Sequence, residues 1–332
     1  MTKNHPKVKY GKTGVLLVNL GTPESTNWLD IRKYLKEFLS DKRVIELNPF
    51  VWKIILNLFI LNFRPSKTAE AYKKIWFKEE NMSPLRYYSI KQKEKLSKKI
   101  KENEIIVEYA MRYGIPSIKD KISRLHKDGC EKLIVLPMYP QYAAATTATV
   151  CDEVFRSLME MRWQPSLQII SHYESEPKYI EALANSVENK IKKIDWSPDV
   201  ILASYHGIPK KYFDKGDPYH CYCQKTSRLL SEKFNKIPIS TSFQSRFGPD
   251  KWLEPYTDKV LEKLPSEGKK NILIICPGFS SDCVETLEEI AIQGKETFLK
   301  YGGKNFDIVP CLNDNEDHIN FLEHLIRKYV NN

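Results

Sequence analysis

One histidine, His206, and two glutamates, Glu285 and Glu289, follow predicted buried strands, where their side chains could act together. His206 follows the apolar, β-branched run 199–205, so it lies where a buried strand ends in a turn. Glu285 and Glu289 follow a second buried run, 271–276, and are four residues apart, which places them on one face of a helix. Imidazole and carboxylate groups bind metal ions and accept protons. The sequence therefore predicts a site for metal binding and deprotonation.

Each of these residues also has an ordinary structural explanation. A histidine at a strand end often serves only as a hydrogen-bonding group, and glutamate is favoured at helix N-termini by the helix dipole. The small residues of the turn 277–281 favour the functional interpretation, because they separate a buried strand from the helix that carries Glu285. Ligand-binding loops of open α/β folds follow the carboxyl ends of strands in this way.

Short apolar runs alternate with helical patterns along the chain. The expected strands are 15–20, 105–110, 133–137, 167–170, 199–205, 237–242 and 271–276. The expected helices are 27–39, 117–126, 177–194, 219–234, 255–264, 284–300 and 315–329. This alternation predicts an α/β fold with parallel sheets that helices cover on both faces.

The length of 332 residues exceeds the usual size of a single core. The strand–helix units form two successive sets that meet near residue 150, which predicts two Rossmann-like lobes with a cleft between them. We assign residues 10–150 to the first lobe and 151–312 to the second, which carries the metal-site pair. The last helix, 313–330, is expected to cross back and complete the first lobe.

The net charge of +10 comes mainly from lysines scattered among glutamates, which is typical of solvated helix faces and not of a nucleic-acid interface. Seven cysteines without regular spacing indicate reduced thiols and a cytoplasmic chain. Residues 1–11 lack the apolar core of a signal peptide, and no apolar segment reaches the about 20 residues that span a bilayer. We expect a soluble protein, or one that touches the inner face of a membrane only peripherally.

Several short motifs occur in one order along nearly the whole chain. They are Asn19-Leu20-Gly21-Thr22-Pro23, Met82-Ser83-Pro84, Met111-Arg112-Tyr113-Gly114, Tyr139-Pro140-Gln141-Tyr142, Ser204-Tyr205-His206-Gly207-Ile208-Pro209, Gly216-Asp217-Pro218-Tyr219, Gln244-Ser245-Arg246-Phe247-Gly248-Pro249, Cys276-Pro277-Gly278-Phe279 and Glu285-Thr286-Leu287. In these motifs and their spacing the chain resembles the ferrochelatases, which insert ferrous iron into protoporphyrin IX.

The resemblance implies a chelatase-like fold that holds the porphyrin between its lobes. It implies that His206 and Glu285 form the metal-site pair and that Glu289 is a further catalytic carboxylate. Fe²⁺ and protoporphyrin IX are then substrates, with no permanently bound cofactor. A neutral imidazole can accept the pyrrole protons or ligate ferrous iron. We favour proton acceptance with transient ligation for His206, and the sequence leaves both open.

The same correspondence implies a porphyrin pocket. Its flat or apolar lining is expected from five residues: Leu20, Tyr72, Ser83, Tyr139 and Trp252. Arg112 is expected to pair with a propionate, because a guanidinium binds carboxylates with two hydrogen bonds. For each aromatic residue, ordinary core packing is an equally good explanation.

The chain departs from relatives at the cysteines. Cys283 stands two residues before Glu285, where many animal members carry histidine, so a proton relay there is in doubt. Some relatives hold a [2Fe–2S] cluster, which needs four suitably placed cysteines. No cysteine follows Cys311, and Cys221 and Cys223 have no evident second pair, so we predict no cluster.

Residues 50–63 form an unusually apolar segment, and the polar positions Lys53, Asn57 and Arg64 fall along one narrow stripe of a helix, so a wide apolar face is bounded by basic residues. A buried core helix would explain it, and so would a helix that lies in a membrane surface. In the family this region forms the lip of the porphyrin pocket. The hypothesis of peripheral membrane contact assigns Trp52, Ile55 and Phe59 to the lipid-facing side.

Three alternatives stay open from the sequence. The chain could insert metal into another ring, either coproporphyrin or a cobalt-corrin precursor, or it could be a tetrapyrrole or metal carrier without turnover. A carrier needs no proton acceptor opposite a carboxylate, which argues against the last. The turn 20–23 lacks the glycine pattern of dinucleotide-binding proteins. A monomer is favoured, and no nucleic acid is expected as a partner.

Overall fold

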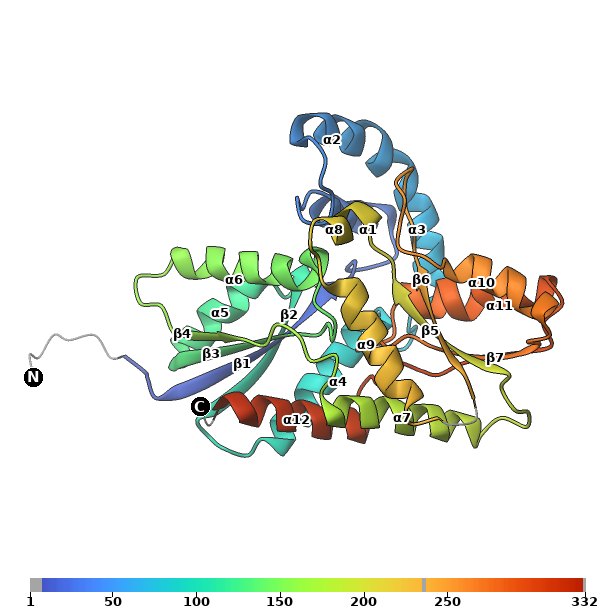
Figure 1. Cartoon of the computed structure of the whole chain (residues 1–332). Coiled ribbons are helices and arrows are strands. Elements are labelled where there is room, and N and C mark those ends of the chain that lie inside the picture. Colours follow the sequence, from blue (N-terminus) through green and yellow to red (C-terminus); the bar gives the residue numbers. More distant parts are fainter. Residues whose placement is uncertain (1–7, 235–236, 331–332) are drawn as a thin grey trace, which may run out of the picture.

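Two parallel sheets of four strands lie side by side in the computed structural model, which describes residues 8–234 and 237–330 (Figure 1). The first sheet has the strand order β2-β1-β3-β4. Its strands are β1 (Lys12–Gly21), β2 (Ile105–Tyr113), β3 (Cys130–Pro137) and β4 (Ser166–Ile169). The central strand β1 is buried on both faces, as expected of a parallel sheet covered by helices on each side.

The second sheet repeats this arrangement with the strand order β6-β5-β7-β8. Its strands are β5 (Val200–His206), β6 (Ile239–Gln244), β7 (Asn271–Ile275) and β8 (Asn305–Ile308). The predicted α/β class with two Rossmann-like lobes is therefore confirmed. Strand β8 was not predicted, because its four residues, at the edge of the sheet, alternate polar and apolar types and form no apolar run.

The helices pack on both faces of each sheet. They are α1 (Trp28–Leu39), α2 (Pro49–Ile55), α3 (Leu61–Ile75), α4 (Pro84–Lys99), α5 (Ile118–Lys127), α6 (Thr149–Met159), α7 (Pro177–Ile191), α8 (Lys210–Asp214), α9 (Tyr219–Ser231), α10 (Thr257–Lys263), α11 (Lys295–Lys300) and α12 (Glu316–Val330). Two π-helical turns, η1 (Leu56–Ile60) and η2 (Ala144–Ala148), a longer π-helix, η4 (Glu285–Gly294), and a 3₁₀ turn, η3 (Leu264–Glu267), complete the set.

The two lobes share one continuous hydrophobic core. A single cluster of buried side chains includes Leu17 and Ile134 of the first sheet together with Ile201 and Ile275 of the second. Helices α4, α7, α9 and α12 contribute to this shared cluster. The outer faces have separate cores, formed with α5 and α6 in the first lobe and with α10, α11 and η4 in the second. The two lobes are therefore packed against each other through apolar side chains.

The strand pairing corrects the expected change of lobe at residue 150. Helix α6 runs across that residue, and the later strand β4 still pairs with β3, so the change of sheet falls between Ile169 and Val200. The alternation of strands and helices does not reveal which sheet a strand joins, because pairing depends on contacts distant in the chain. Helix α12 packs against α4, β3 and α7, and the limits of the lobes as domains stay a prediction.

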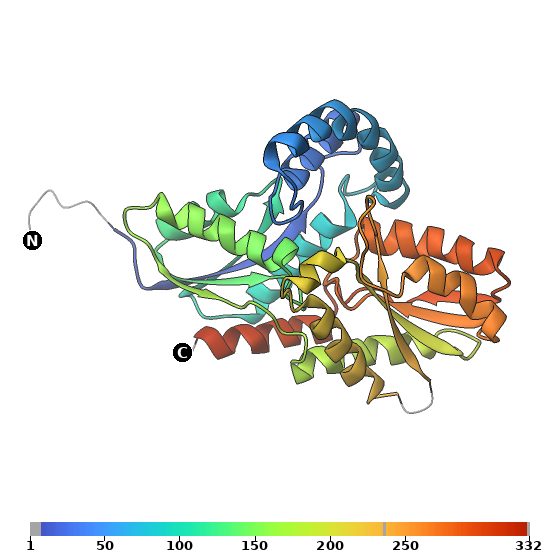
Figure 2. The ribbon, with the colours of Figure 1, turned by 45° about the horizontal axis from the view of Figure 1, so that its top comes forward.

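The apolar segment 50–63 is not one regular helix. It is formed by α2, the π-turn η1 and the start of α3. This segment projects from the body of the molecule (Figures 1 and 2). Pro65 lies inside α3, where it supplies no N–H for the helical ladder. Trp52 points inward, with 9% exposure, and its indole N–H donates to the carbonyl of Leu39. The assignment of Trp52 to a lipid-facing side is therefore wrong.

Candidate active site

His206 is the last residue of β5, and its ring nitrogen has a fixed partner. Its Nδ1 lies 2.6 Å from the carbonyl oxygen of Gly207, which accepts a hydrogen bond and so assigns the proton to Nδ1. The side chain is half-buried. The neutral ring in this tautomer keeps the lone pair on Nε2, the atom that accepts a proton or ligates a metal.

Gln244 joins the histidine to the carboxylates. It ends β6 directly opposite His206 in the strand register, and its carbonyl accepts from the N–H of Gly207 at 2.7 Å. Its side-chain amide donates to the carbonyl of Glu285 at 2.8 Å, and its Oε1 accepts from Ser204 at 2.7 Å. With 4% exposure, this one side chain connects the ends of β5 and β6 to the start of η4.

Glu285 and Glu289 lie on a π-helix and not on the predicted α-helix. In a π-helix the turn is wider than in an α-helix, so residues four apart no longer lie directly above each other. Residues five apart come closer: the side-chain amide of Gln293 donates to the carboxylate of Glu288 at 2.7 Å. Such π-helical turns are rare and occur frequently at functional sites. The predicted helix is therefore present. Its π-helical hydrogen bonds could not be told from α-helical ones by the periodicity of the sequence.

The Glu289 carboxyl is held by Ser245. The backbone N–H of Ser245 donates to Oε1 at 2.7 Å, and the Ser245 hydroxyl donates to Oε2. The pKa of Glu289 is raised, mainly because the carboxyl is buried. The charge of Glu285 raises this pKa further, whereas the hydrogen bond from Ser245 and the charge of His206 lower it. Ser245 follows Gln244, which lies opposite His206 and donates to the carbonyl of Glu285, so the three predicted catalytic residues occupy one neighbourhood.

An apolar wall from the first lobe lies beside Glu285. Leu20 of β1, Tyr72 of α3 and the residues flanking Glu285, Val284 and Leu287, share one hydrophobic cluster. Burial raises the pKa of Tyr72 far above its usual range, and the charge of Glu285 raises it further. Two predicted pocket residues, Leu20 and Tyr72, are therefore brought next to the predicted metal ligand.

Trp252 follows β6 in the second lobe, and Tyr139 packs against the outer core of the first lobe. The Trp252 indole N–H donates to the carbonyl of Phe247 at 2.9 Å, and a Cβ on Gly207 would meet the Trp252 ring at 3.2 Å. Trp252 therefore packs beside the residue that follows His206. Tyr139 follows β3, and its hydroxyl is buried without a hydrogen-bond partner among the described residues.

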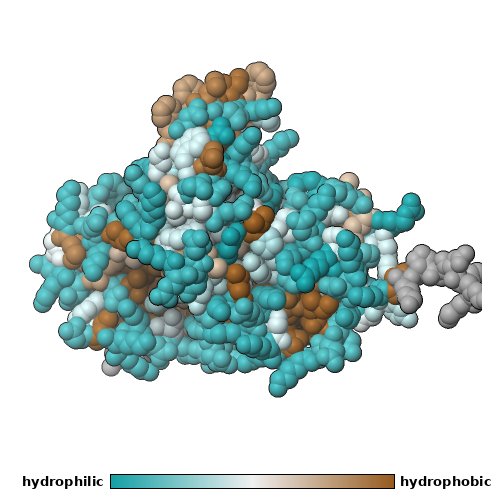
Figure 3. Space-filling view, turned by 180° about the vertical axis from the view of Figure 1, so that it is seen from behind, coloured by the Kyte–Doolittle hydropathy of each residue, from teal (hydrophilic) through white to brown (hydrophobic). Residues whose placement is uncertain are grey.

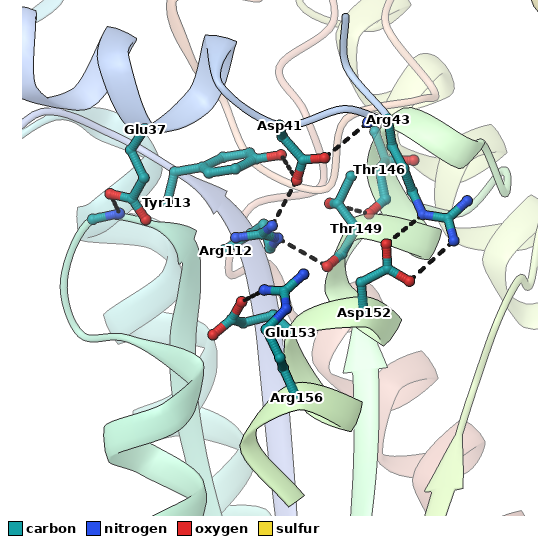
Figure 4. Close-up of polar contacts among 11 residues, drawn as sticks. Glu37, Asp41, Arg43, Arg112, Tyr113, Thr146, Thr149, Asp152, Glu153 and Arg156 are labelled. Atoms are coloured by element: carbon teal, nitrogen blue, oxygen red, sulfur yellow. Dashed lines mark hydrogen bonds and ion pairs between the residues drawn. The ribbon is translucent and has the colours of Figure 1, made fainter. Parts of the chain in front are cut away.

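Arg112 is occupied by a carboxylate of the protein itself (Figure 4). Its guanidinium donates to Asp41 at 2.6 Å and to the carbonyl of Thr149 at 2.8 Å, and it lies over the ring of Tyr113. Both partners of this ion pair are about nine-tenths buried, at 9% and 10% side-chain exposure. The predicted contact with a propionate would have to break the pair, so this geometry does not support it.

Ser83 is likewise committed to the fold. Its exposure is 1%, and its hydroxyl caps α4 by accepting from the N–H of Arg86 at 3.2 Å. N-capping is the usual role of serine at this position of a helix. The structure therefore gives Ser83 a structural function, and its predicted place in the pocket lining has no support here.

Arg64 is a candidate that the sequence pattern did not single out. The guanidinium lies 4.5 Å from the ring centroid of Phe247, and no carboxylate of residues 8–234 or 237–330 forms an ion pair with it. Burial of the guanidinium against its neighbours lowers the pKa of Arg64, and the charge of Glu285 opposes that shift, although the residue as a whole is exposed. Arg64 therefore lies against the second-lobe loop that carries Phe247, with no ion-pair partner among the described residues.

Cys283 is buried next to Glu285. Burial raises its pKa well above the usual range, and the charge of Glu285 raises it further. The thiol is therefore neutral, which makes it a poor base at the position where the sequence left a relay in doubt. All seven cysteines are free, and the absence of a cluster stays a prediction.

Known proteins resemble this chain over nearly its whole length. The family model described as Ferrochelatase matches residues 12–330. The chain belongs to the ferrochelatase family. It is 53% identical to the ferrochelatase of Allorhizobium ampelinum, over 99% of this chain and 96% of that protein. It is 51% identical to the ferrochelatase of Francisella tularensis subsp. holarctica, over 97% of each chain.

Solved structures show the same fold at low identity. SirB from Bacillus subtilis with Fe³⁺ aligns with a TM-score of 0.57 at 12% identity, covering 96% of this chain and 95% of that one. The sirohydrochlorin chelatase SirB from Bacillus subtilis subspecies spizizenii in complex with cobalt aligns with a TM-score of 0.51 at 12% identity, covering 96% and 94%. The chelatase-like fold predicted from the motifs is confirmed.

Membership of the family defines the reaction. The chain is a lyase of haem biosynthesis that inserts Fe²⁺ into protoporphyrin IX and releases two protons to give protohaem. No observation favours coproporphyrin, a cobalt-corrin precursor or a carrier without turnover. Among the described residues, no helix has both the length and the apolar character required to cross a membrane.

Proposed function

We propose that His206 accepts the pyrrole protons of the porphyrin while Glu285 and Glu289 hold the incoming iron and carry protons away. The observation that supports this most directly is the hydrogen-bond system of Gln244, which links the strand end of His206 to the first residue of η4. An imidazole with a free Nε2 is a suitable acceptor near neutral pH. Carboxylates bind hydrated divalent iron weakly enough to release it.

His206 and Glu285 are proposed as the groups that contact iron. With Nδ1–H held by the Gly207 carbonyl, Nε2 can accept a proton or ligate iron transiently. Glu289 is proposed as the second carboxylate. Its raised pKa suits a group that binds and releases protons closer to neutral pH than an ordinary carboxyl.

The porphyrin is proposed to lie against Leu20, Tyr72, Tyr139 and Trp252. Their apolar and aromatic surfaces suit a flat macrocycle. Arg64 is proposed as the partner of a propionate in place of Arg112, because the Arg64 guanidinium has no carboxylate partner among the described residues whereas Arg112 is paired with Asp41. Ser83 is proposed to act only through the position of α4.

Peripheral contact with an anionic membrane is proposed for the tip of the molecule, which we call the lip and define as residues 50–63. Its apolar side chains form a brown cap in the space-filling view (Figure 3). The largest exposures are those of Phe50 at 74%, Phe63 at 75%, Leu58 at 60% and Phe59 at 57%. A cytoplasmic monomer that touches the inner face of the membrane remains our proposal.

The catalytic assignment is tested with purified protein, Fe²⁺ and protoporphyrin IX under anaerobic conditions, by following the absorbance of haem. We expect His206→Ala and Glu285→Ala each to lower turnover by about 100-fold or more, the range of a lost acid–base group, while porphyrin binding stays measurable by fluorescence. Glu296→Ala, an exposed carboxylate on α11, serves as the control and should keep full activity. Near wild-type rates in either test variant would overturn the assignment.

A further inference from the structure

Gln92 of α4 makes an unusual set of contacts across the boundary between the lobes. It is 1% exposed, and its amide nitrogen lies within hydrogen-bond distance of three acceptors. These are the carbonyl of Asn313 at 2.8 Å, the hydroxyl of Ser281 at 2.9 Å and the carbonyl of Ser280 at 3.3 Å. Because two of the three are carbonyls that cannot donate, the amide must present its NH₂ group to them.

The contacted residues lie in the two loops that precede η4 and α12. Ser280 and Ser281 belong to the loop from β7 to η4, and Asn313 belongs to the loop from β8 to α12. Asn313 joins these loops to each other, since its Oδ1 accepts from the N–H of Asp282 at 2.8 Å and its Nδ2 donates to the Asp282 carboxylate at 2.6 Å. Its backbone is left-handed, with φ of 48°, a conformation in which asparagine is enriched.

Asp282 continues the connection to the start of η4. Its carboxylate accepts from the hydroxyl of Thr286 at 3.0 Å, and that hydroxyl accepts from the N–H of Cys283 at 3.1 Å. Thr286 is fully buried and is the neighbour of Glu285. A chain of hydrogen bonds therefore runs from Gln92 in the first lobe to the turn that presents Glu285.

A second attachment keeps η4 in place independently. Lys74 of α3 pairs with the buried Glu288 at 2.9 Å, and α3 packs along η4. Loss of the Gln92 contacts should therefore leave the helix attached while allowing its first turn to shift. A shift of about 1 Å in a catalytic group can cost about 100-fold in rate.

We infer that Gln92 is a positioning residue. It holds the start of η4, and with it Glu285 and Glu289, in the position relative to Tyr72 of the first lobe that iron insertion requires. This inference rests on the proposed roles of the two carboxylates. Gln92 acts through Asn313 and Asp282.

The test compares Gln92→Leu with Leu96→Ala in the full-length protein. Leu96 is fully buried on the same helix, so its truncation removes packing without removing a hydrogen bond to the loops. We expect Gln92→Leu to lower kcat for haem formation by about 10- to 100-fold, with KM for protoporphyrin changed less than about threefold. Leu96→Ala should lower the melting temperature and leave kcat near the wild-type value.

Asn313→Ala gives a second test, which stands if Gln92→Leu does not fold. It should reproduce the loss in kcat at unchanged KM, and the double variant should lose little more than either single one, because both residues act in one connection. A wild-type kcat in folded Gln92→Leu or Asn313→Ala overturns the inference, as does a kcat loss in Leu96→Ala as large as theirs. If Glu285→Ala is itself active, the proposed function fails and the inference about Gln92 fails with it. If Glu285→Ala is inactive while folded Gln92→Leu keeps the wild-type kcat, only the inference fails.

Discussion

The guanidinium of Arg64 lies 4.5 Å from the centre of the Phe247 ring and so joins the two lobes. Arg64 comes from α3 in the first lobe, and Phe247 from the loop after β6 in the second. A cation over an aromatic face contributes about 0.5 to 1 kcal/mol at exposed sites. A carboxylate ligand binds a guanidinium more strongly than a ring does, so a propionate can replace this contact.

Replacement of the two arginines should therefore have different effects. Arg64→Met should raise KM for protoporphyrin about tenfold, because a hydrogen bond to a charged group contributes about 1.5 to 3 kcal/mol, while the melting temperature stays unchanged. Arg112→Met should instead cost about 3 to 5 kcal/mol of unfolding free energy, because it leaves Asp41 buried and unpaired. Steady-state kinetics and urea unfolding measure both quantities. If only Arg112→Met raised KM tenfold, and did so at unchanged stability, Arg112 and not Arg64 would be the partner of the propionate.

Glu289→Gln should stabilise the fold while lowering activity. The raised pKa means that the folded state holds the Glu289 proton more tightly than the unfolded state does. Wild-type stability is therefore lost as the pH rises through that pKa, and the amide variant avoids this loss. We expect the variant to melt about 2 °C higher than the wild type at pH 8, with a smaller difference at pH 4.5. Differential scanning calorimetry at both pH values measures it, and a difference that is larger at pH 4.5 would contradict the sign.

His318 should make the fold sensitive to acid. Burial lowers its pKa from 6.5 to about 4, and its Nδ1 donates to the carbonyl of Asn313 at 2.6 Å. Between these two values the unfolded state binds a proton that the folded state does not, so stability falls as the pH falls. The loss from pH 7 to pH 5 should be about 2 kcal/mol. Urea unfolding should show His318→Gln to lose about 2 kcal/mol less than the wild type over this range, and equal losses would contradict the prediction.

The lip should bind anionic vesicles through its exposed apolar side chains. Substitution of Leu58, Phe59 and Phe63 together by serine should reduce flotation with phosphatidylglycerol vesicles by about 100-fold or more, since each buried apolar side chain contributes about 1.5 to 3 kcal/mol. The control replaces Phe155 and Met159 of α6, which are 49% and 79% exposed on another part of the surface. Equal losses in the control, or unchanged flotation of the lip variant, would remove the membrane contact.

Much of the fold and the centre of the site could be predicted from the sequence. The runs at 199–205 and 271–276 became β5 and β7, because apolar β-branched residues in short runs form buried strands. The carboxyl ends of neighbouring parallel strands meet at one edge of a sheet. His206 at the end of β5 and Glu285 after β7 were therefore expected near the same edge of the sheet, and only the motifs added the identity of the substrate.

Gln244 had a signal that the sequence interpretation did not use. It lies two residues after the predicted strand 237–242 and ends the observed strand β6, in the same position relative to its sheet as His206. Polar residues at equivalent strand ends could have been compared, and Gln244 would then have joined the candidate site.

Other roles were decided only by the tertiary structure. Arg112 and Ser83 were assigned to the pocket. Arg112 instead forms an ion pair with Asp41, and Ser83 caps the N-terminus of α4. Trp52 lies in an apolar segment but turns inward. Local periodicity defines strands and helices because it depends on neighbours a few residues away. The partner of a polar or aromatic side chain depends on residues brought near by folding, so no local pattern can state which groups are left free for a ligand.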